Sequence, residues 1–148
     1  MADRFKMNYV LPDPYKALAA LDTYTKHSGI PPIQREMIKI RASQINGCAF
    51  CVDTHTKEAR RLGETEQRIY VMSVWREARN LFTEEEQLLL EMTEEMTLIH
   101  QHGLSDRLYE KAVSRWGEER TAHVLLAIIN INSWNRIGVG LNLHPQRP

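Results

Sequence analysis

Apolar residues recur three or four positions apart through most of the chain, with polar residues between them. Leu88, Met92 and Met96 form one such series, and Val124, Ile128 and Ile131 form another. This spacing places the apolar side chains on one face of an α-helix. Alternating runs joined by a hairpin turn, the mark of strands, are nearly absent. The pattern therefore predicts an all-α protein, a bundle of about six to seven helices.

Proline and glycine mark where these helices end. None of the six prolines lies between residues 33 and 144, and five of the seven glycines follow a helix-like stretch: Gly29, Gly47, Gly63, Gly103 and Gly117. Glycine adopts the left-handed turn that closes a helix. We predict N-caps at Asp13, followed by Pro14 at the first helical position, and at Ser105, and a capping box opening at Thr83. The predicted helices cover about residues 13–28, 32–46, 48–62, 65–74, 83–102, 105–116 and 118–142.

Length and charge bound the function. The chain has 148 residues, which predicts one domain over residues 1–148, and folding at this size buries roughly 70% of the unfolded chain's surface. The 19 basic and 19 acidic side chains balance, so we expect neither nucleic acid nor an anionic membrane as a partner. No run is apolar enough to span a bilayer. Residues 1–10 carry charges and lack the apolar core of a signal peptide, so we expect a cytoplasmic protein.

Candidate chemistry is concentrated in residues 46–55. Cys48 and Cys51 are the only cysteines, and His55 follows four positions after the second one. In the cytoplasm such a pair is more often catalytic or metal-binding than a structural disulfide. Gly47 ends one predicted helix and Cys48 begins the next, where a helix N-terminus favours a thiolate. On a helix Cys48 and Cys51 share a face, as do Cys51 and His55, so the ring could act as a general base. Cys48 is nearer the helix start and Cys51 nearer His55, so either could be the more acidic thiol.

Glu36 is the candidate partner of His55. A carboxylate commonly fixes the orientation of a functional histidine ring. Glu36 lies on the preceding helix, which the tight turn at Gly47 joins to the helix of His55. Its stretch is partly apolar, and a buried carboxylate is costly unless it is paired. We therefore expect the two side chains to meet.

Other chemistries use the same residues. Zinc prefers four ligands, which Cys48, Cys51 and His55 could supply together with Glu36 or His123. Covalent haem attachment is excluded, because it needs a histidine directly after the second cysteine, where this chain has Val52.

The spacing Glu36-x11-Cys48-x2-Cys51-x3-His55 resembles the core motif of the AhpD-like alkylhydroperoxidases, within the carboxymuconolactone decarboxylase superfamily. The approach to the first cysteine, residues 42–47, is also similar to that family, and residues 129–137 resemble its last helix. The strong match covers about residues 31–63, with weaker support near 125–140.

The resemblance implies an AhpD-like helical bundle that assembles as a homo-oligomer, commonly a trimer or hexamer, and needs no cofactor or metal. It implies peroxide reduction in which Cys51 attacks and becomes a sulfenic acid, Cys48 resolves it to a disulfide, and Glu36 and His55 relay protons. An external dithiol, thioredoxin-like or of lipoyl type, would then reduce the disulfide. Better-known members carry another histidine just before the second cysteine, where this chain has Phe50.

That departure keeps other functions open. A thiol-disulfide oxidoreductase or a redox sensor with little peroxidase turnover would use the same cysteines. A decarboxylase-like lyase acting on a small lactone acid would not depend on a CxxC pair, so the cysteines argue against that activity.

Overall fold

The computed structural model describes residues 4–147, and within that range every regular element is a helix, which confirms the predicted all-α class. In chain order the elements are α1 (Met7–Val10), α2 (Pro12–Lys26), α3 (Pro32–Asn46), α4 (Ala49–Arg61), α5 (Glu66–Val71), the 3₁₀ helices η1 (Met72–Glu77) and η2 (Arg79–Leu81), α6 (Glu84–Thr97), α7 (Ile99–His102) and α8 (Asp106–Gly140).

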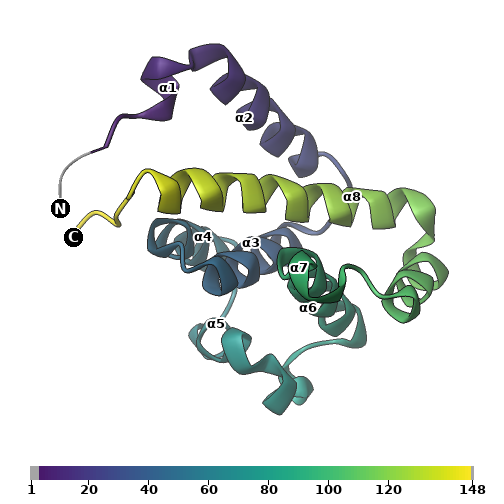
Figure 1. The fold of residues 1–148 in the computed structure, drawn as a ribbon. Helices are drawn as coiled ribbons and strands as arrows, with labels where there is room; N and C mark the ends of the chain where they lie inside the picture. Colours follow the sequence, from purple (N-terminus) through teal and green to yellow (C-terminus); the bar gives the residue numbers. More distant parts are fainter. Residues whose placement is uncertain (1–3, 148) are drawn as a thin grey trace.

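The long helix α8 crosses the middle of the molecule and separates two groups of helices (Figure 1). On one side lie α1 and α2, and on the other lie α3, α4, α6 and α7 (Figure 1). The central element of the second group is α3, which packs against α4, α6 and α8. The N-terminal segment contacts the end of α8, because Arg4 Nη1 donates a 2.5 Å hydrogen bond to the carbonyl oxygen of Gly140.

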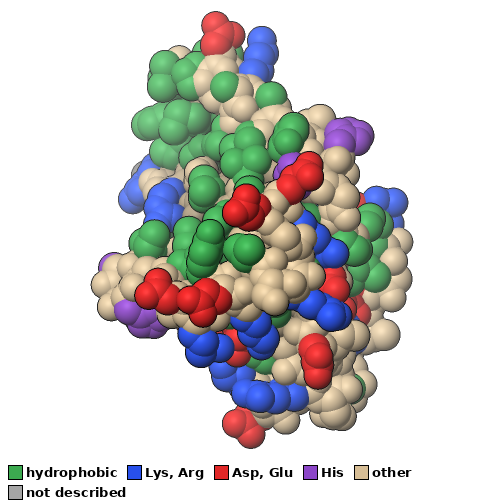
Figure 2. Space-filling view, turned by 90° about the vertical axis from the view of Figure 1, so that its right-hand side faces the viewer, with side chains coloured by type: hydrophobic (Ala, Val, Ile, Leu, Met, Phe, Trp, Pro, Cys, Tyr) green, Lys and Arg blue, Asp and Glu red, His purple; other side chains and the backbone are tan. Residues whose placement is uncertain are grey.

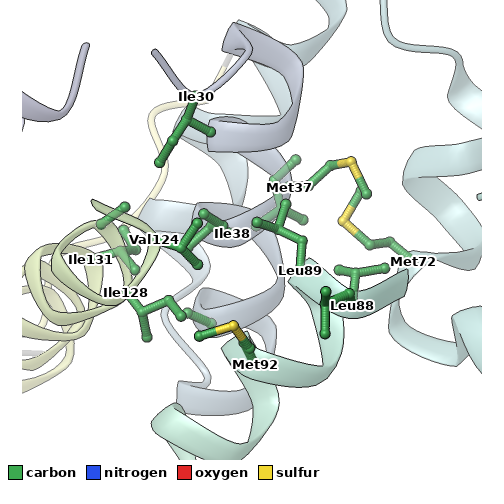
Figure 3. Close-up of a cluster of buried hydrophobic side chains, with 14 of the residues drawn as sticks. Ile30, Met37, Ile38, Met72, Leu88, Leu89, Met92, Val124, Ile128 and Ile131 are labelled. Atoms are coloured by element: carbon green, nitrogen blue, oxygen red, sulfur yellow. The ribbon is translucent and has the colours of Figure 1, made fainter. Parts of the chain in front are cut away.

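The hydrophobic core lies where α3, α6 and α8 meet (Figure 3). The apolar series predicted from helical spacing point into it: Leu88 and Met92 from α6, and Val124, Ile128 and Ile131 from α8, are all at most 1% exposed. Fully burying one such side chain stabilises the fold by about 1.5–3 kcal/mol. This core fixes α3, which carries Glu36, and α8, which borders the candidate site; α4, which carries Cys51 and His55, packs against α3.

The five glycines predicted to end helices are the described glycines with positive φ. Gly47 matters most, because it caps α3 at φ 67° and ψ 29°. This left-handed conformation is open to glycine at little cost, and it turns the chain sharply at the end of α3. As a result α4 runs back against α3, and Cys48 stands at its start.

Several helix ends differ from the predictions. α2 begins at Pro12 with Leu11 as N-cap, so Asp13 lies in the first turn instead of capping it. Two prolines stand close together here, and either can occupy a first turn because the missing N–H is not needed there. The short helix α1 was not predicted, since four residues carry too little periodicity to recognise.

One predicted helix is divided in the structure, and one predicted break is present. The predicted helix 83–102 stops at Thr97, where the backbone of Leu98 leaves the helical region, and α7 follows. The predicted break at Gly117 is confirmed: α8 is numbered as one element, but its backbone leaves the helical region at this glycine, with φ 76° and ψ 169°. The Thr83 capping box and the Ser105 N-cap are present as predicted.

Among the described residues, no helix combines the length and the apolar character needed to cross a bilayer. Residues 1–3 and 148, at the ends of the predicted single domain, lie outside the described range. The single domain and the cytoplasmic location stay predictions.

Candidate active site

The two cysteines stand at the turn between α3 and α4 and are joined in a disulfide. Cys48 is the N-cap of α4, and its Sγ accepts a hydrogen bond from the backbone N–H of Cys51 at 3.3 Å. Both residues are buried, with 2% of Cys48 and 5% of Cys51 exposed. A sulfur at this place meets the orphan N–H groups and positive end of a helix, which stabilise negative charge. The local structure therefore favours thiolate chemistry.

His55 lies one turn after Cys51 on α4 and pairs with Glu36 of α3. Its Nδ1 is 2.8 Å from Glu36 Oε2, and Glu36 is only 2% exposed. An ionised carboxylate can only accept a hydrogen bond, so the ring nitrogen facing it carries the proton. Nε2 is then the ring atom that can exchange a proton with another group. The structure thus contains the expected pairing of a buried acid with the imidazole.

A lysine and a second acid extend this pair. Lys39 Nζ lies 3.6 Å from Glu36 Oε1 and 2.8 Å from Asp22 Oδ1 of α2, and the lysine side chain is 6% exposed. Buried charges are tolerated when each has a partner of opposite sign. Glu36 therefore has a cation on one oxygen and the imidazole on the other. The same lysine fastens α2 to α3 beside the site.

Cys51 and His55 open onto a cavity of about 360 Å³ between α1, α2, α4 and the end of α8. Apolar and aromatic side chains form most of its wall: Met7, Tyr15, Phe50, Trp134, Ile137, Leu141 and Leu143. The rings of Tyr15 and Trp134 meet edge to face, with centroids 5.0 Å apart. A concave, mostly apolar space with a few polar groups is the usual form of a small-molecule site. The sulfur and the imidazole are positioned to react with what enters it.

Amides that are buried or half-buried tie α8 to the turn that carries the cysteines. Asn46 Nδ2 donates to Asn132 Oδ1 and to Asn135 Oδ1, each at 2.9 Å. Asn135 Nδ2 in turn donates to Ser43 Oγ at 2.9 Å. A satisfied buried network of this kind is rigid and holds one relative position of its elements. It fixes α8 against the end of α3 just before the disulfide.

The structure brings together Glu36, Cys48, Cys51 and His55, the four residues predicted from the sequence. Their catalytic roles stay predictions. His123, considered above as a zinc ligand, lies elsewhere, with its Nε2 4.0 Å from Glu119. Within residues 4–147 no group of three or more His, Cys, Asp or Glu side chains could hold a metal ion.

Sequence reasoning missed several parts of the site. Lys39 and Asp22 give no local signal, because their meeting depends on how α2 packs on α3. Trp134 lines the cavity, but a tryptophan in a helical pattern gives no local signal that separates a cavity wall from a core position. Gly138 did leave a signal: it stands inside a helical pattern that it does not end, where glycine is a poor choice unless another group comes close.

The family follows from a match over more than half of the chain. Residues 12–94 match the model of the carboxymuconolactone decarboxylase family. The chain belongs to this family. The match includes all four predicted site residues, and it confirms the predicted superfamily.

Relatives extend the likeness over nearly the whole chain. The uncharacterised protein YdfG of Bacillus subtilis is 43% identical over 141 residues, which is 95% of each chain. A crystal structure from Agrobacterium tumefaciens, of a protein of unknown function described as a candidate AhpD antioxidant defence protein, is 41% identical. It superposes with a TM-score of 0.92, over 99% of this chain and 100% of that one. An AhpD-like member of the family is therefore the right description of this chain.

A more distant structure shares only the fold. An uncharacterised peroxidase-related protein from a Silicibacter species has a TM-score of 0.78 at 20% identity, over 88% of this chain and 69% of that one. At this identity the likeness supports the helical architecture of the family and carries no argument about chemistry.

Proposed function

We propose that the protein is a cysteine-dependent peroxidase that reduces hydroperoxides through the Cys48–Cys51 pair. One observation carries the proposal: the disulfide lies at the wall of a cavity, beside an imidazole whose other nitrogen is held by a buried carboxylate. A reversible dithiol, a proton-transfer group and a space for a small molecule are the three parts that thiol peroxidase chemistry needs.

The oxidative half begins from the reduced pair. The Cys51 thiolate attacks the terminal oxygen of the hydroperoxide, the O–O bond breaks, and Cys51 becomes a sulfenic acid. The departing alkoxide takes a proton from the His55–Glu36 pair and leaves as the alcohol. Cys48 then attacks the Cys51 sulfur, the S–O bond breaks, and water leaves as the disulfide forms. The disulfide in the structure corresponds to the end of this half.

The reductive half needs an external dithiol of the thioredoxin or lipoyl type. One of its thiolates attacks the disulfide, and its second thiol resolves the mixed disulfide, which returns Cys48 and Cys51 to thiols. Over a full cycle one hydroperoxide and one dithiol give one alcohol, one water and one disulfide. The electrons therefore pass from the carrier to the peroxide through this pair.

A second candidate is a thiol-disulfide oxidoreductase or redox sensor with little peroxidase turnover. Phe50 favours it, because an aromatic side chain stands where better-known AhpD-like enzymes carry a histidine. Phe50 lines the cavity and is 37% exposed, so it contributes an apolar wall and no proton. His55 would have to serve every proton transfer at the site.

We also propose that the protein works as a homo-oligomer. Hydrophobic side chains gather on the part of the surface that α1 and α2 occupy (Figure 2). In these two helices Tyr9 is 76% exposed, Val10 56% and Tyr24 52%. Exposed apolar clusters of this kind support a protein contact. Sedimentation of the purified protein would measure the order of the assembly.

The peroxidase proposal is tested with purified protein, cumene hydroperoxide or hydrogen peroxide, and dithiothreitol, dihydrolipoamide or thioredoxin as reductant. Cys51→Ser should abolish peroxide consumption, because it removes the attacking sulfur. With no dithiol present, the pre-reduced Cys48→Ser variant should still consume about one peroxide per chain and stop as the sulfenic acid instead of a disulfide, since the resolving thiol is missing.

Three outcomes separate the candidates. Unchanged turnover in Cys51→Ser would refute the peroxidase. Rapid disulfide formation by the wild type without cycling, in the presence of every dithiol tried, would favour the sensor. Conversion of a lactone acid by the variant that lacks both cysteines would point to the decarboxylase-like lyase.

A further inference from the structure

Gly138 of α8 stands directly over the disulfide. A Cβ atom placed on Gly138 would lie 2.8 Å from Cys48 Sγ and 3.3 Å from Cys51 Sγ. Non-bonded atoms of this size prefer separations of about 3.5–4.0 Å. Any side chain at this position therefore collides with both sulfurs at once, and the backbone of α8 comes as close to the disulfide as glycine permits.

The helix has little freedom to move away from the sulfurs. The hydrogen bonds among Asn46, Asn132, Asn135 and Ser43 tie α8 to the end of α3 within two turns before Gly138. Asn135 is 1% exposed and Ser43 is 0% exposed, so breaking this network would strand buried polar groups. A collision at Gly138 is therefore relieved more readily by displacing the sulfurs than by displacing the helix.

The two oxidation states differ in how far the sulfurs can be displaced. A disulfide restricts both Cys48 and Cys51, because each sulfur is bonded to the other. Free thiols rotate independently between staggered positions, and each of these residues borders open space: Cys51 lines the cavity described above, and Cys48 lines a second pocket together with Gly47 and Ala49. A methyl group at position 138 thus collides with the disulfide and is tolerated by the dithiol.

We propose that Gly138 sets the dithiol/disulfide balance of this site by leaving the room that the disulfide occupies. Helix stability does not account for the glycine, since alanine is the better helix former. Gly140, on the same helix, provides the contrast: a Cβ built there meets no described atom within 4 Å. A side chain at position 138 would contact the reacting sulfurs, whereas a side chain at position 140 would not.

The inference rests on the proposed cycling of this pair, but it can be measured without peroxide. In a glutathione buffer, two glutathione molecules reduce one protein disulfide to the dithiol and form one glutathione disulfide. Two electrons and two protons move, and both redox partners are supplied. The fraction of protein dithiol, read by alkylation and mass spectrometry, gives the equilibrium constant.

We compare the full-length wild type with Gly138→Ala and with Gly140→Ala. Gly138→Ala should shift the equilibrium at least tenfold toward the dithiol, a reduction potential about 30 mV less negative. Gly140→Ala should keep the wild-type equilibrium. An unshifted Gly138→Ala, or an equal shift in both variants, would overturn the inference.

The Gly138→Ala variant could also fail to fold. In that case Cys48→Ala is added, because it removes the sulfur nearest to the new methyl group. The inference expects the double variant to fold and to melt near the temperature of Cys48→Ala alone. A double variant that is still unfolded shows that the methyl collides with something other than the sulfur, and this too would overturn it.

The two proposals fail separately. A wild type that consumes no peroxide, while Gly138→Ala shifts the glutathione equilibrium, removes the peroxidase and leaves the role of Gly138 in place. An active peroxidase whose equilibrium is insensitive to Gly138→Ala does the opposite.

Discussion

Two buried glutamates in this molecule have almost the same burial and entirely different surroundings. Glu36 is 2% exposed and Glu94 is 8% exposed, and both lie in helices of the core. Glu94 accepts hydrogen bonds from Trp75 Nε1 at 2.9 Å, from Arg41 Nε at 2.7 Å and from Arg76. Its partners come from α3 and η1, so it joins three elements.

Glu36 has a titratable partner instead. One of its oxygens faces His55, and the other faces Lys39. Arginine and indole N–H groups keep their protons at any working pH, whereas an imidazole gains and loses one near neutrality. The difference suggests that Glu94 holds the fold together, while Glu36 serves proton transfer at the cavity. Burial of an acid alone does not distinguish the two roles; the partner does.

The largest effect that we predict is on catalysis at Glu36. Glu36→Gln keeps the shape of the side chain and removes its charge, so the imidazolium that forms when His55 takes a proton loses its stabilising partner. We expect the rate of peroxide consumption by the folded protein to fall by about 10³-fold. Stopped-flow measurement of Cys51 oxidation would show it.

Glu94→Gln is the matched control, because it makes the same substitution at the other buried acid. Its folded fraction should oxidise at the wild-type rate. If both variants lost activity equally, or if Glu36→Gln oxidised at the wild-type rate, the proposed division of roles would be wrong.

The second prediction concerns stability at Glu94. In Glu94→Gln one carboxylate oxygen becomes an amide N–H₂, which cannot accept the hydrogen bonds that Trp75 and the two arginines donate. The two arginines also lose their negative partner. Breaking a buried ion pair from one side costs about 3 kcal/mol. We expect the free energy of unfolding in urea at pH 7 to fall by about this amount. A change of less than about 0.5 kcal/mol, the usual size for a surface substitution, would contradict the structural role.

The third prediction is a pH dependence from the same residue. Burial by itself would raise the pKa of Glu94, but the hydrogen bonds from Arg76, Trp75 and Arg41 outweigh it and hold the pKa below its ordinary value. A lowered pKa in the folded state contributes stability above the unfolded value of about 4.3 and loses it as pH falls through the folded value. Wild type and Glu94→Gln should therefore differ at neutral pH and converge in acid.

Melting temperatures measured from pH 7 down to pH 3 would test this convergence. Glu86 has the same direction of shift: burial by itself would raise its pKa, but hydrogen bonds from Arg68 and Thr83 outweigh burial and hold the pKa below its ordinary value. Its contribution should disappear over the same acidic range. A gap between wild type and Glu94→Gln that stays constant down to pH 3 would contradict the ionised state of Glu94.

The smallest predicted effect concerns proton transfer at the cavity, where Glu36 and His55 lie. Phe50→His restores the histidine that better-known AhpD-like enzymes carry before the second cysteine. If His55 alone limits proton transfer, the added imidazole at the cavity should raise peroxide turnover by less than about tenfold, below the usual range of about 10²–10⁴-fold for general acid–base catalysis, because His55 already transfers protons. Phe50→Leu, which changes shape without adding a proton carrier, is the control and should give no increase.

The helices were predictable because their signals are local. Gly47 could be assigned as a helix end from the sequence alone, because glycine adopts a positive φ more readily than other residues. Leu88 and Val124 could be assigned to the core because their spacing matches one helix face. The end of α6 at Thr97 was not predictable, because Leu98 and Ile99 continue the apolar pattern and the next glycine is Gly103.

The candidate site was also predictable where its residues lie close together in the sequence. Cys48 is the N-cap of α4, and Cys51 and His55 lie in its first two turns. Their spacing alone therefore places them together. Glu36 was reached because a tight turn makes α3 and α4 neighbours. The contact of Lys39 with Asp22 and the placement of Trp134 at the cavity depend on α2 and α8, which are remote in the chain, and no local signal marks them.

Residue types and short-range spacing decided, before any folding was considered, that this chain is helical and that its two sulfurs and an imidazole form one group. Those features depend on backbone preferences and on side chains a few positions apart. Three features arose only when distant helices packed. They are the cavity, the different hydrogen-bond partners of Glu36 and Glu94, and the approach of Gly138 to the sulfurs. Their positions are set by the shared core and by buried polar contacts, which join residues that the linear chain keeps far apart.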